Sequence, residues 1–320
     1  MFQTQPSRLR VVFVASTLTF LALTVLACQR DESAPRGTPE RPLRVMLIPA
    51  YGGTEDGTLS DFRPLFHAIT SAYDLHFDLR VGSSYSAVVE AMANAQVDIA
   101  WFGMVSYVQA RERGGAELLA VPVDEGEAVY YSGLFHHVDS GMQSVTDLDG
   151  KRLALGDPSS SSGFNFPVAL LLNEGVNPIH DLRGIVLAGN HAASLSALNN
   201  REVDACAAPL LNYDRAVNEG VLDPDQIVLL AKSDGIPNPP LAMHPGLPED
   251  LKNTLREAFH TVHERPEVNP DWIRGEGGKV YERYDAHFDE QVFIDAMDRL
   301  EAVDDSLRQE ILRRAQERQR

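Results

Sequence analysis

Short apolar segments alternate with helical segments along most of this chain, and this alternation constrains the fold more than any other feature. Strands that alternate with helices are typical of an α/β layer fold with a largely parallel sheet flanked by helices. In the first half, periodicity predicts strands at 43–48, 75–81, 97–102, 118–123 and 129–135, and helices at 61–71, 86–95 and 105–113.

The same alternation begins again after residue 151. Two such series predict two lobes with a ligand cleft between them. The proline-rich segment 234–245 is expected to return the chain to the first lobe, which would comprise residues 43–132 and 236–320, with residues 133–235 in the second. The second series has expected strands at 152–155, 184–187, 203–207 and 226–230, and helices at 164–173, 192–199 and 210–219. After the return to the first lobe, helices at 248–262, 289–303 and 306–318 are expected to close the chain.

The sequence GDPSSSSGFNFP, at 156–167, joins an expected strand to the helix that follows it. Four consecutive serines, closed by Gly163, therefore lie at a helix N-terminus. The first turn of a helix has N–H groups without internal partners, and the helix dipole favours negative charge there. The pattern predicts an anion site lined with hydroxyl groups. A flexible serine linker is the alternative, although apolar segments flank the serines closely.

Residues 1–27 have the layout of a secretory signal, because Arg8 and Arg10 precede the uncharged run 11–27. The sequence VLAC that ends at Cys28 resembles a bacterial lipobox, in which the cysteine is lipidated and becomes the mature N-terminus. The alternative is a single transmembrane anchor, for which the 17 residues of the apolar run are at the short limit. A lipoprotein anchored through Cys28 is expected.

The polar residues 28–42 are expected to form a tether. Lipidation of Cys28 leaves Cys206 as the other cysteine, in an apolar run, where a small buried side chain is expected. Two cysteines offer no disulfide framework and no cysteine-based metal site. His260 and His263 have a spacing that metal ligands use, but this spacing on a helix is more typical of a solvated face. No metal or cofactor is expected.

The net charge of the chain argues against nucleic acid as a partner. The formal charge is −18, and removal of Arg8 and Arg10 with the signal takes it to −20 (−18 − 2). A protein this acidic does not bind nucleic acid by neutralising phosphates. Any anion that it binds must be held by local dipoles and hydrogen bonds.

Six segments, in order and near the expected spacing, resemble the periplasmic phosphate-, phosphite- and phosphonate-binding components of ABC importers, the PhnD type. The resemblance covers about residues 43–245. The segments are 84–91 (SYSAVVEA), 97–103 (VDIAWFG) with Tyr107, 130–132 (YYS), 147–151 (DLDGK), 157–163 (DPSSSSG) with Pro167, and 203–205 (VDA) with His191.

The resemblance implies a two-lobed, type II venus-flytrap fold with two strand crossings at the hinge. It also implies that the serine turn holds phosphoryl oxygens, with Ser-Ser-Ser here where the family usually has Ser-Thr-Ser. Hydroxyl, backbone N–H and imidazole N–H groups are the donors that a tetrahedral oxyanion needs. The implied ligand contacts are Tyr85, Tyr130, Ser160, Ser161, Ser162 and His191.

Simpler roles compete with some of these assignments. Tyr85 and Tyr130 could serve as half-buried packing residues, and His191 could cap a helix or lie at the surface. Asp98 and Asp204, in similar contexts at strand entries, are interpreted as capping groups. Tyr107 is interpreted as a core residue.

Some family members bind aminoalkyl phosphonates and hold the ammonium group with carboxylates from two segments. The corresponding segments of this chain lack an acid at those positions. The corresponding residues are Leu211 and either Asn238 or Pro239. We therefore expect a ligand without an amine, such as phosphite, methylphosphonate, phosphate or a similar small oxyanion.

The leading functional hypothesis is a non-enzymatic, monomeric lipoprotein at the periplasmic or cell-surface side, bound to the membrane only through its lipid. It would deliver a small phosphorus oxyanion to the permease and ATPase subunits of an ABC importer. A binding protein that presents its ligand to a membrane sensor kinase is the first alternative. A serine-dependent phosphate-ester hydrolase is the second, although the serine run lacks a G-x-S-x-G elbow.

Overall fold

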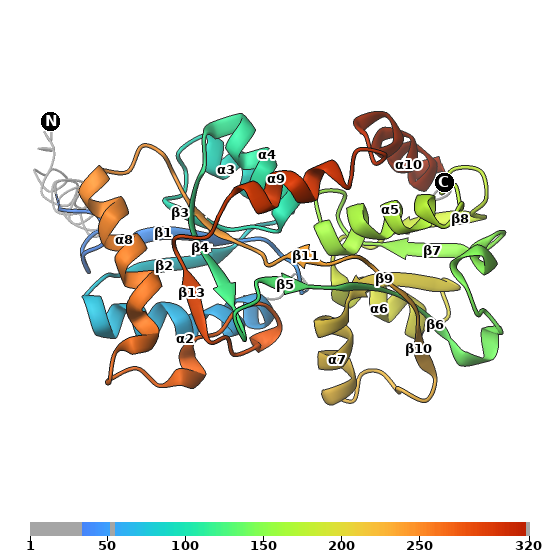
Figure 1. Ribbon diagram of the computed structural model, residues 1–320, viewed down its shortest axis with the longest axis horizontal. Coiled ribbons are helices and arrows are strands. Elements are labelled where there is room, and N and C mark those ends of the chain that lie inside the picture. Colours follow the sequence, from blue (N-terminus) through green and yellow to red (C-terminus); the bar gives the residue numbers. More distant parts are fainter. Residues whose placement is uncertain (1–33, 52–54, 318–320) are drawn as a thin grey trace, which may run out of the picture.

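The computed structural model describes residues 34–51 and 55–317. Figure 1 shows two lobes side by side, joined by two thin crossing segments and by the C-terminal segment, which runs from one lobe to the other. A six-stranded sheet forms the centre of one lobe and a five-stranded sheet the centre of the other, and a two-stranded ladder lies between them. This is the two-lobed α/β architecture that the two strand–helix series predict.

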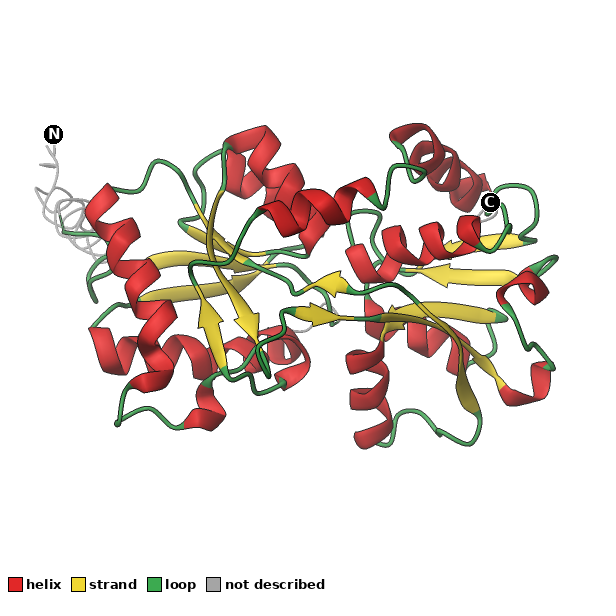
Figure 2. Ribbon diagram, in the orientation of Figure 1, coloured by secondary structure: helices red, strands yellow, loops and turns green. Residues whose placement is uncertain are grey.

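The six-stranded sheet has the order β13-β4-β12-β3-β1-β2, with β1 parallel to β2 and β3 and with β12 antiparallel to both β3 and β4. Alternate side chains of β1 are buried, as its sequence LRVML predicts. Helices cover the sheet on both sides (Figure 2). The elements are β1 (Leu43–Leu47), β2 (Phe77–Val81), β3 (Ile99–Trp101), β4 (Glu117–Val123), β12 (Leu241–Met243), β13 (Arg283–Asp285), α2 (Glu55–Tyr73), α3 (Tyr85–Ala93), α4 (Met104–Gly114) and α8 (Glu249–Thr261).

The five-stranded sheet has the order β10-β6-β9-β7-β8, with β7 parallel to β8 and β9 and with β6 antiparallel to β9 and β10. All residues of β9 are buried, including Cys206, because this strand lies in the middle of the sheet. The elements are β6 (Ser132–His137), β7 (Arg152–Leu155), β8 (Gly184–Leu187), β9 (Ala205–Pro209), β10 (Ile227–Lys232), α5 (Phe166–Asn173), α6 (His191–Asn199) and α7 (Leu210–Asn218).

The chain crosses between the lobes at β5 (Val129–Tyr130) and β11 (Ile236–Pro237), which pair antiparallel with each other. The single strand expected at 129–135 is wrong in one respect, because the structure divides it at Tyr131. The division has a physical cause: residues before it pair with β11, whereas residues after it pair with β9 inside the second sheet.

The C-terminal helices α9 (Gln291–Asp298) and α10 (Asp305–Glu317) follow the last strand. Residues 236–320 are all expected in the first lobe, but α10 lies against β8 of the second lobe (Figure 1). Ile311 and Ala315 are its buried residues, and Arg314 donates a hydrogen bond to the carbonyl of Leu182. This apolar face explains where α10 packs, since it needs a partner surface.

Several helix boundaries also differ from those expected from the sequence. The helix expected at 61–71 extends over Glu55–Tyr73, and the one expected at 289–303 is shortened to Gln291–Asp298. No helix within residues 34–51 and 55–317 is both long enough and apolar enough to cross a membrane. The expected signal, Cys28 and the first part of the expected tether lie outside the described residues.

Candidate functional site

The serine turn folds as the N-terminal end of a helix in the second lobe. Residues Ser161–Asn165 form a π-helical turn, η4, which continues directly into α5. The Ser160 hydroxyl accepts a hydrogen bond from the Gly163 amide at 2.9 Å and so caps this turn. Ser160, Ser161 and Ser162 are only 1–3% exposed. The alternative of a flexible linker is therefore wrong.

A hydroxyl of the serine turn also contacts the first lobe. The Ser161 Oγ accepts a hydrogen bond of 3.0 Å from the Val105 amide, which belongs to the first turn of α4. Gly103 precedes this helix, and a Cβ there would lie 3.4 Å from the Ser161 Oγ. Since Gly103 has no side chain to cap α4, the serine of the opposite lobe satisfies one of its free N–H groups.

The two tyrosines of the predicted site meet the two outer serines. Tyr85 is the first residue of α3, is 2% exposed, and its hydroxyl lies beside the Ser160 side chain. Tyr130, on the crossing strand β5, lies beside the Ser162 side chain in the same way. Burial raises the pKa of both hydroxyls above the ordinary value, with a further contribution from the charge of Glu276. Both tyrosines therefore remain neutral and can donate hydrogen bonds.

His191 is buried as the first residue of α6 in the second lobe. Asn190 caps this helix by accepting from Ala193, so His191 is neither the cap nor a surface residue. Its ring packs on the serine turn, because a Cβ at Gly163 would lie 3.0 Å from the ring Cε1. Burial lowers the pKa of His191 to about 3. The imidazole is thus neutral, and its Nδ1 has no partner among the described residues.

Four helix N-termini meet at this place. The first residues of α3 and α4 come from the first lobe, and those of η4 and α6 from the second. The contacts of Ser160 with Tyr85, of Ser161 with Val105 and of His191 with Gly163 hold them together. The positive ends of four helix dipoles therefore converge between the lobes, where they favour a negative charge.

Glu276 also lies among these residues, although its sequence position did not predict a role in the site. It begins a short 3₁₀ turn, η7 (Glu276–Gly278), and is 6% exposed. Its Oε1 lies 3.7 Å from the Nε2 of His191 and has no hydrogen-bond partner in the described structure. Burial, together with the charge of Asp61, raises the pKa of Glu276 to about 8. The only sequence signal was an acid within the glycine-rich run 275–278.

The positions without a carboxylate have structural roles. Asn238 is buried at the crossing, where its side chain donates to the carbonyl of Pro122 at 2.8 Å. Leu211 packs against η7, since a Cβ at Gly277 would lie 3.0 Å from its Cγ. Both positions lack an acid, as the sequence shows, yet Glu276 brings a carboxyl group to the site from another segment. The absence of an amine from the ligand stays a prediction.

An ion pair joins the lobes beside this site. Arg215 on α7 binds Asp61 on α2 with an Nη1–Oδ1 distance of 3.0 Å. The Gly277 amide donates to the same carboxylate at 3.0 Å, and the guanidinium lies 3.9 Å from the ring centroid of Tyr51. Burial raises the pKa of Asp61 to about 6 even though Arg215 opposes the shift. Asp61 thus links α2, α7 and η7.

The residues interpreted as structural have structural contacts. Asp98 accepts hydrogen bonds from the amide and guanidinium of Arg44, and Asp204 accepts one from the amide of Arg152. Tyr107 is a buried core residue whose hydroxyl donates to Glu290. These contacts confirm the interpretation of Asp98, Asp204 and Tyr107.

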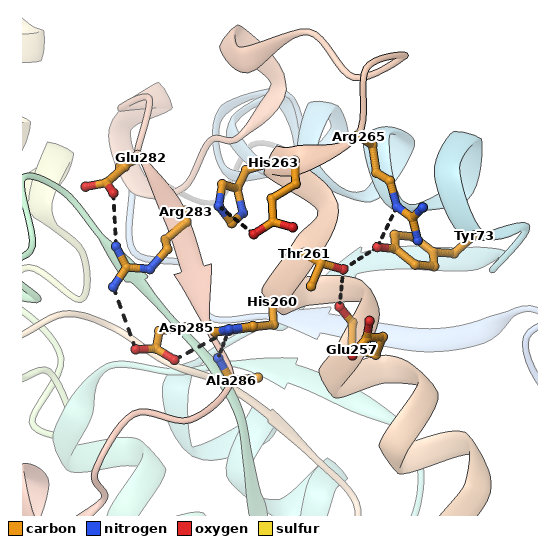
Figure 3. Close-up of polar contacts among 11 residues, drawn as sticks. Tyr73, Glu257, His260, Thr261, His263, Arg265, Glu282, Arg283, Asp285 and Ala286 are labelled. Carbon is orange, nitrogen blue, oxygen red and sulfur yellow. Dashed lines mark hydrogen bonds and ion pairs between the residues drawn. The ribbon is translucent and has the colours of Figure 1, made fainter.

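The histidine pair near the C-terminal end of α8 has separate partners (Figure 3). His260 Nδ1 accepts a hydrogen bond from the Ala286 amide and lies 3.5 Å from Asp285. His263 lies beside Glu264, with 3.8 Å between Nε2 and Oε1. Within the described ranges, no three His, Cys, Asp or Glu side chains come together as potential metal ligands.

Comparison with known proteins identifies the family. A family model described as the periplasmic substrate-binding protein of phosphonate ABC transporters matches residues 52–287. The chain belongs to this family. It is therefore an extracytoplasmic substrate-binding component of an ABC transporter, with a small-molecule ligand and with membrane permease and ATPase subunits as partners.

Relatives in the family include proteins named for phosphate and for phosphonates. The chain is 29% identical to the phosphate-import protein PhnD of Mycolicibacterium smegmatis over 260 residues, which cover 77% of this chain and 80% of the relative. It is 29% identical to the phosphonates-binding periplasmic protein of Escherichia coli over 188 residues, 57% of this chain and 55% of that protein.

Solved structures share the type II fold of the family. The binding component of a Pseudomonas aeruginosa phosphonate transporter has a TM-score of 0.69 at 20% identity, covering 87% of this chain and 99% of that one. PhnD1 of Prochlorococcus marinus, in complex with methylphosphonate, has a TM-score of 0.68 at 17% identity, covering 82% and 97%. The two-lobed fold expected from the resemblance is confirmed.

Proposed function

We propose that this protein is a non-enzymatic binding lipoprotein that captures phosphite, a phosphonate or phosphate between its lobes and delivers it to an ABC permease. The observation that carries this proposal is the convergence of four helix N-termini on buried hydroxyl groups. An acidic protein can hold an anion there without a neighbouring cation, because aligned dipoles and donors replace the positive field.

The donors are suited to an oxyanion that only accepts hydrogen bonds. Ser160 and Ser161 each accept a bond from a backbone amide, so the hydrogen of each hydroxyl can turn towards the ligand. We assign ligand contact to Tyr85, Tyr130, Ser160, Ser161, Ser162 and His191. Hydrogen bonds to a charged group contribute about 1.5–3 kcal/mol each. Four or five of them, reduced by the free-energy cost of lobe closure, are compatible with a Kd of about 1 μM or lower.

The names of relatives support this ligand class. One relative is named for phosphate import, and a structural neighbour was solved with methylphosphonate. Residues 43–132 with most of 236–320, and residues 133–235, are the proposed lobes. A lipid on Cys28 would hold a monomer at the membrane surface. Fractionation tests this anchor, because Cys28→Ser should move the protein from the membrane to the soluble fraction, and an unchanged distribution would contradict it.

A thermal-shift screen tests the ligand class. The domain from residue 34 is heated with phosphate, phosphite, methylphosphonate, aminoethylphosphonate or sulfate, at matched ionic strength. An anion at about 100 times its Kd should stabilise the protein by about 2.7 kcal/mol, which gives a clear rise in melting temperature. A rise with at least one amine-free phosphorus oxyanion is the expected result. No rise with any of them would overturn the proposal, and a rise with aminoethylphosphonate alone would overturn the prediction of an amine-free ligand.

A further inference from the structure

Glu276 is a buried acid without a structural partner. The side chain is 7% exposed, and its Oε1 makes no hydrogen bond within the described structure. A carboxyl group in this state destabilises a fold unless another group satisfies it. Its neighbour from the other lobe, His191, has an unpartnered Nδ1 as well. Two buried polar groups that both lack partners at one place indicate that a ligand completes their hydrogen bonding.

The position of Glu276 shows which end of a ligand it meets. Its Oε1 lies 3.7 Å from His191, whose ring packs on the serine turn. Its charge also acts on the hydroxyls of Tyr85 and Tyr130, which lie beside Ser160 and Ser162. The carboxyl group thus lies next to His191 and acts electrostatically on Tyr85 and Tyr130, which are three of the donors assigned to the oxyanion. This position favours contact with the oxyanion over contact with a distant substituent of the ligand.

No free cation among the described residues offsets the charge of Glu276. Arg215 of α7 is engaged by Asp61 of α2, and Lys279 by Asp124. The other titratable groups that face Glu276 are His191 of α6, Tyr85 of α3, Tyr130 of β5 and Tyr281 of the C-terminal segment. An ionised Glu276 about 4 Å from an anion would raise the energy of the complex by about 4 kcal/mol at an effective dielectric constant near 20.

We propose that Glu276 is protonated in the complex and donates a hydrogen bond to an oxygen of the bound oxyanion, so that ligand capture at high pH takes up one proton. This inference rests on the proposed function. The proton comes from solvent, is bound by the carboxylate of Glu276, and stays there while the ligand is held. No covalent bond to the ligand forms or breaks.

The facing groups leave a clear pH window for a test. Burial raises the pKa of Glu276 to about 8, whereas the pKa of His191 is lowered to about 3 and that of Asp61 is about 6. Burial raises the pKa of Tyr85, Tyr130 and Tyr281 above the ordinary value. Between about pH 7.5 and 9.5, Glu276 is therefore the member of this group that changes its charge.

Calorimetry measures both proton uptake and affinity. Methylphosphonate or inorganic phosphate, whichever the wild type binds, is titrated at about pH 6 and about pH 9 in pairs of buffers with different ionisation enthalpies. Three proteins are compared: the wild type, Glu276→Gln and Glu282→Gln. Glu276→Gln keeps the shape of the side chain but has no titratable carboxyl group, and Glu282→Gln makes the same change at an exposed site. Thermal unfolding of Glu276→Gln checks that it is folded.

At about pH 9 the wild type and Glu282→Gln should take up close to one proton more than Glu276→Gln, and at about pH 6 this difference should vanish. The affinity of the wild type should fall towards tenfold per pH unit above the pKa of Glu276, with a weaker dependence in Glu276→Gln. Equal proton uptake in all three proteins, or a wild-type affinity that is constant above pH 8, would overturn the inference.

Other outcomes separate this inference from the proposed function. A wild type that binds no phosphorus oxyanion refutes the function and the inference together. A wild type that binds one without the proton difference refutes the inference alone. If Glu276→Gln loses only aminoethylphosphonate and leaves proton uptake with phosphate unchanged, the carboxylate pairs with an ammonium group and the inference is wrong. If the variant does not fold, the pH dependence of the wild type alone decides.

Discussion

At the residue scale, burial determines the charge of the ionisable groups between the lobes. His191 and Glu276 lie 3.7 Å apart, yet burial lowers the pKa of the first to about 3 and raises the pKa of the second to about 8. Near neutral pH both are uncharged, so they form no salt bridge. Near neutral pH these two groups therefore add no charge of their own beside the neutral donors that the site presents to an anion.

Glu276→Gln should stabilise the ligand-free protein by an amount that grows with pH. Burial raises the pKa from 4.5 to about 8, so the folded state keeps a proton that the unfolded chain has already released. The stabilisation that this proton gives the folded state is complete below pH 4.5. It is lost as pH rises through about 8, at about 1.4 kcal/mol of unfolding free energy per pH unit. Denaturant unfolding at several pH values measures this difference. A difference that does not change between about pH 5 and 8 would refute the shift.

Residue types with a strong local pattern could be predicted from the sequence. The serines of the turn, Tyr85 and His191 stand at helix starts, and the structure brings them together. Glu276 could not be predicted, because it belongs to a glycine-rich segment far along the chain. Its place depends on long-range contacts, such as that of Gly277 with Leu211 and that of the Gly277 amide with Asp61.

At the element scale, α2 and α7 come from different lobes and meet through one buried ion pair. Asp61 has 6% of its side chain exposed and Arg215 18%. Opening the lobes would expose both groups to water, whereas closing them without the pair would leave Asp61 buried and unpaired. The ion pair therefore favours the closed arrangement and is not needed for the fold of either lobe.

Arg215→Ala should weaken ligand binding more than it weakens the fold. Loss of the guanidinium leaves the carboxylate of Asp61 without its charged partner only in the closed form, at about 1.5–3 kcal/mol, or about 10- to 150-fold in Kd. Arg201→Ala is the matched control, since Arg201 binds exposed Asp139 within the second lobe. Calorimetric titration compares them. Equal affinities in the two variants would show that the cross-lobe pair does not assist closure.

The elements themselves were mostly predictable, because strands and helices follow apolar periodicity. The break between β5 and β6 was not, since it falls at Tyr131, where the chain leaves one sheet for another, and this depends on pairing with distant strands. The position of α10 was not predictable either. Its buried face identifies a packed helix, but which lobe receives that face depends on the path of the whole chain.

At the scale of the whole molecule, net charge and site act in opposite directions. The formal charge of −18 repels an approaching anion beyond the reach of the helix N-termini. The dipoles and hydroxyls attract it only close to the helix N-termini, since dipole effects fall off within about one helical turn. Affinity is therefore expected to come from slow dissociation and not from electrostatic steering.

Salt should accelerate association instead of slowing it. Screening of the negative charge of the protein shortens the range of repulsion to about 8 Å at physiological ionic strength. Stopped-flow measurement of phosphate or methylphosphonate binding between about 10 and 150 mM sodium chloride tests this expectation. Sodium acetate at equal ionic strength controls for competition by chloride. A rate constant that falls with either salt would indicate positive steering and contradict this expectation.

The most direct measurement is the affinity of the wild type and of Ser160→Ala/Ser162→Ala for phosphate, phosphite and methylphosphonate by calorimetry. The two hydroxyls lie between the lobes, beside Tyr85 and Tyr130. Their loss should weaken binding of the preferred anion by at least about 100-fold, since each hydrogen bond to a charged group contributes about 1.5–3 kcal/mol. The exposed pair Ser60→Ala/Ser71→Ala on α2 should bind like the wild type. An unchanged affinity in Ser160→Ala/Ser162→Ala would show that the serine turn does not hold the oxyanion.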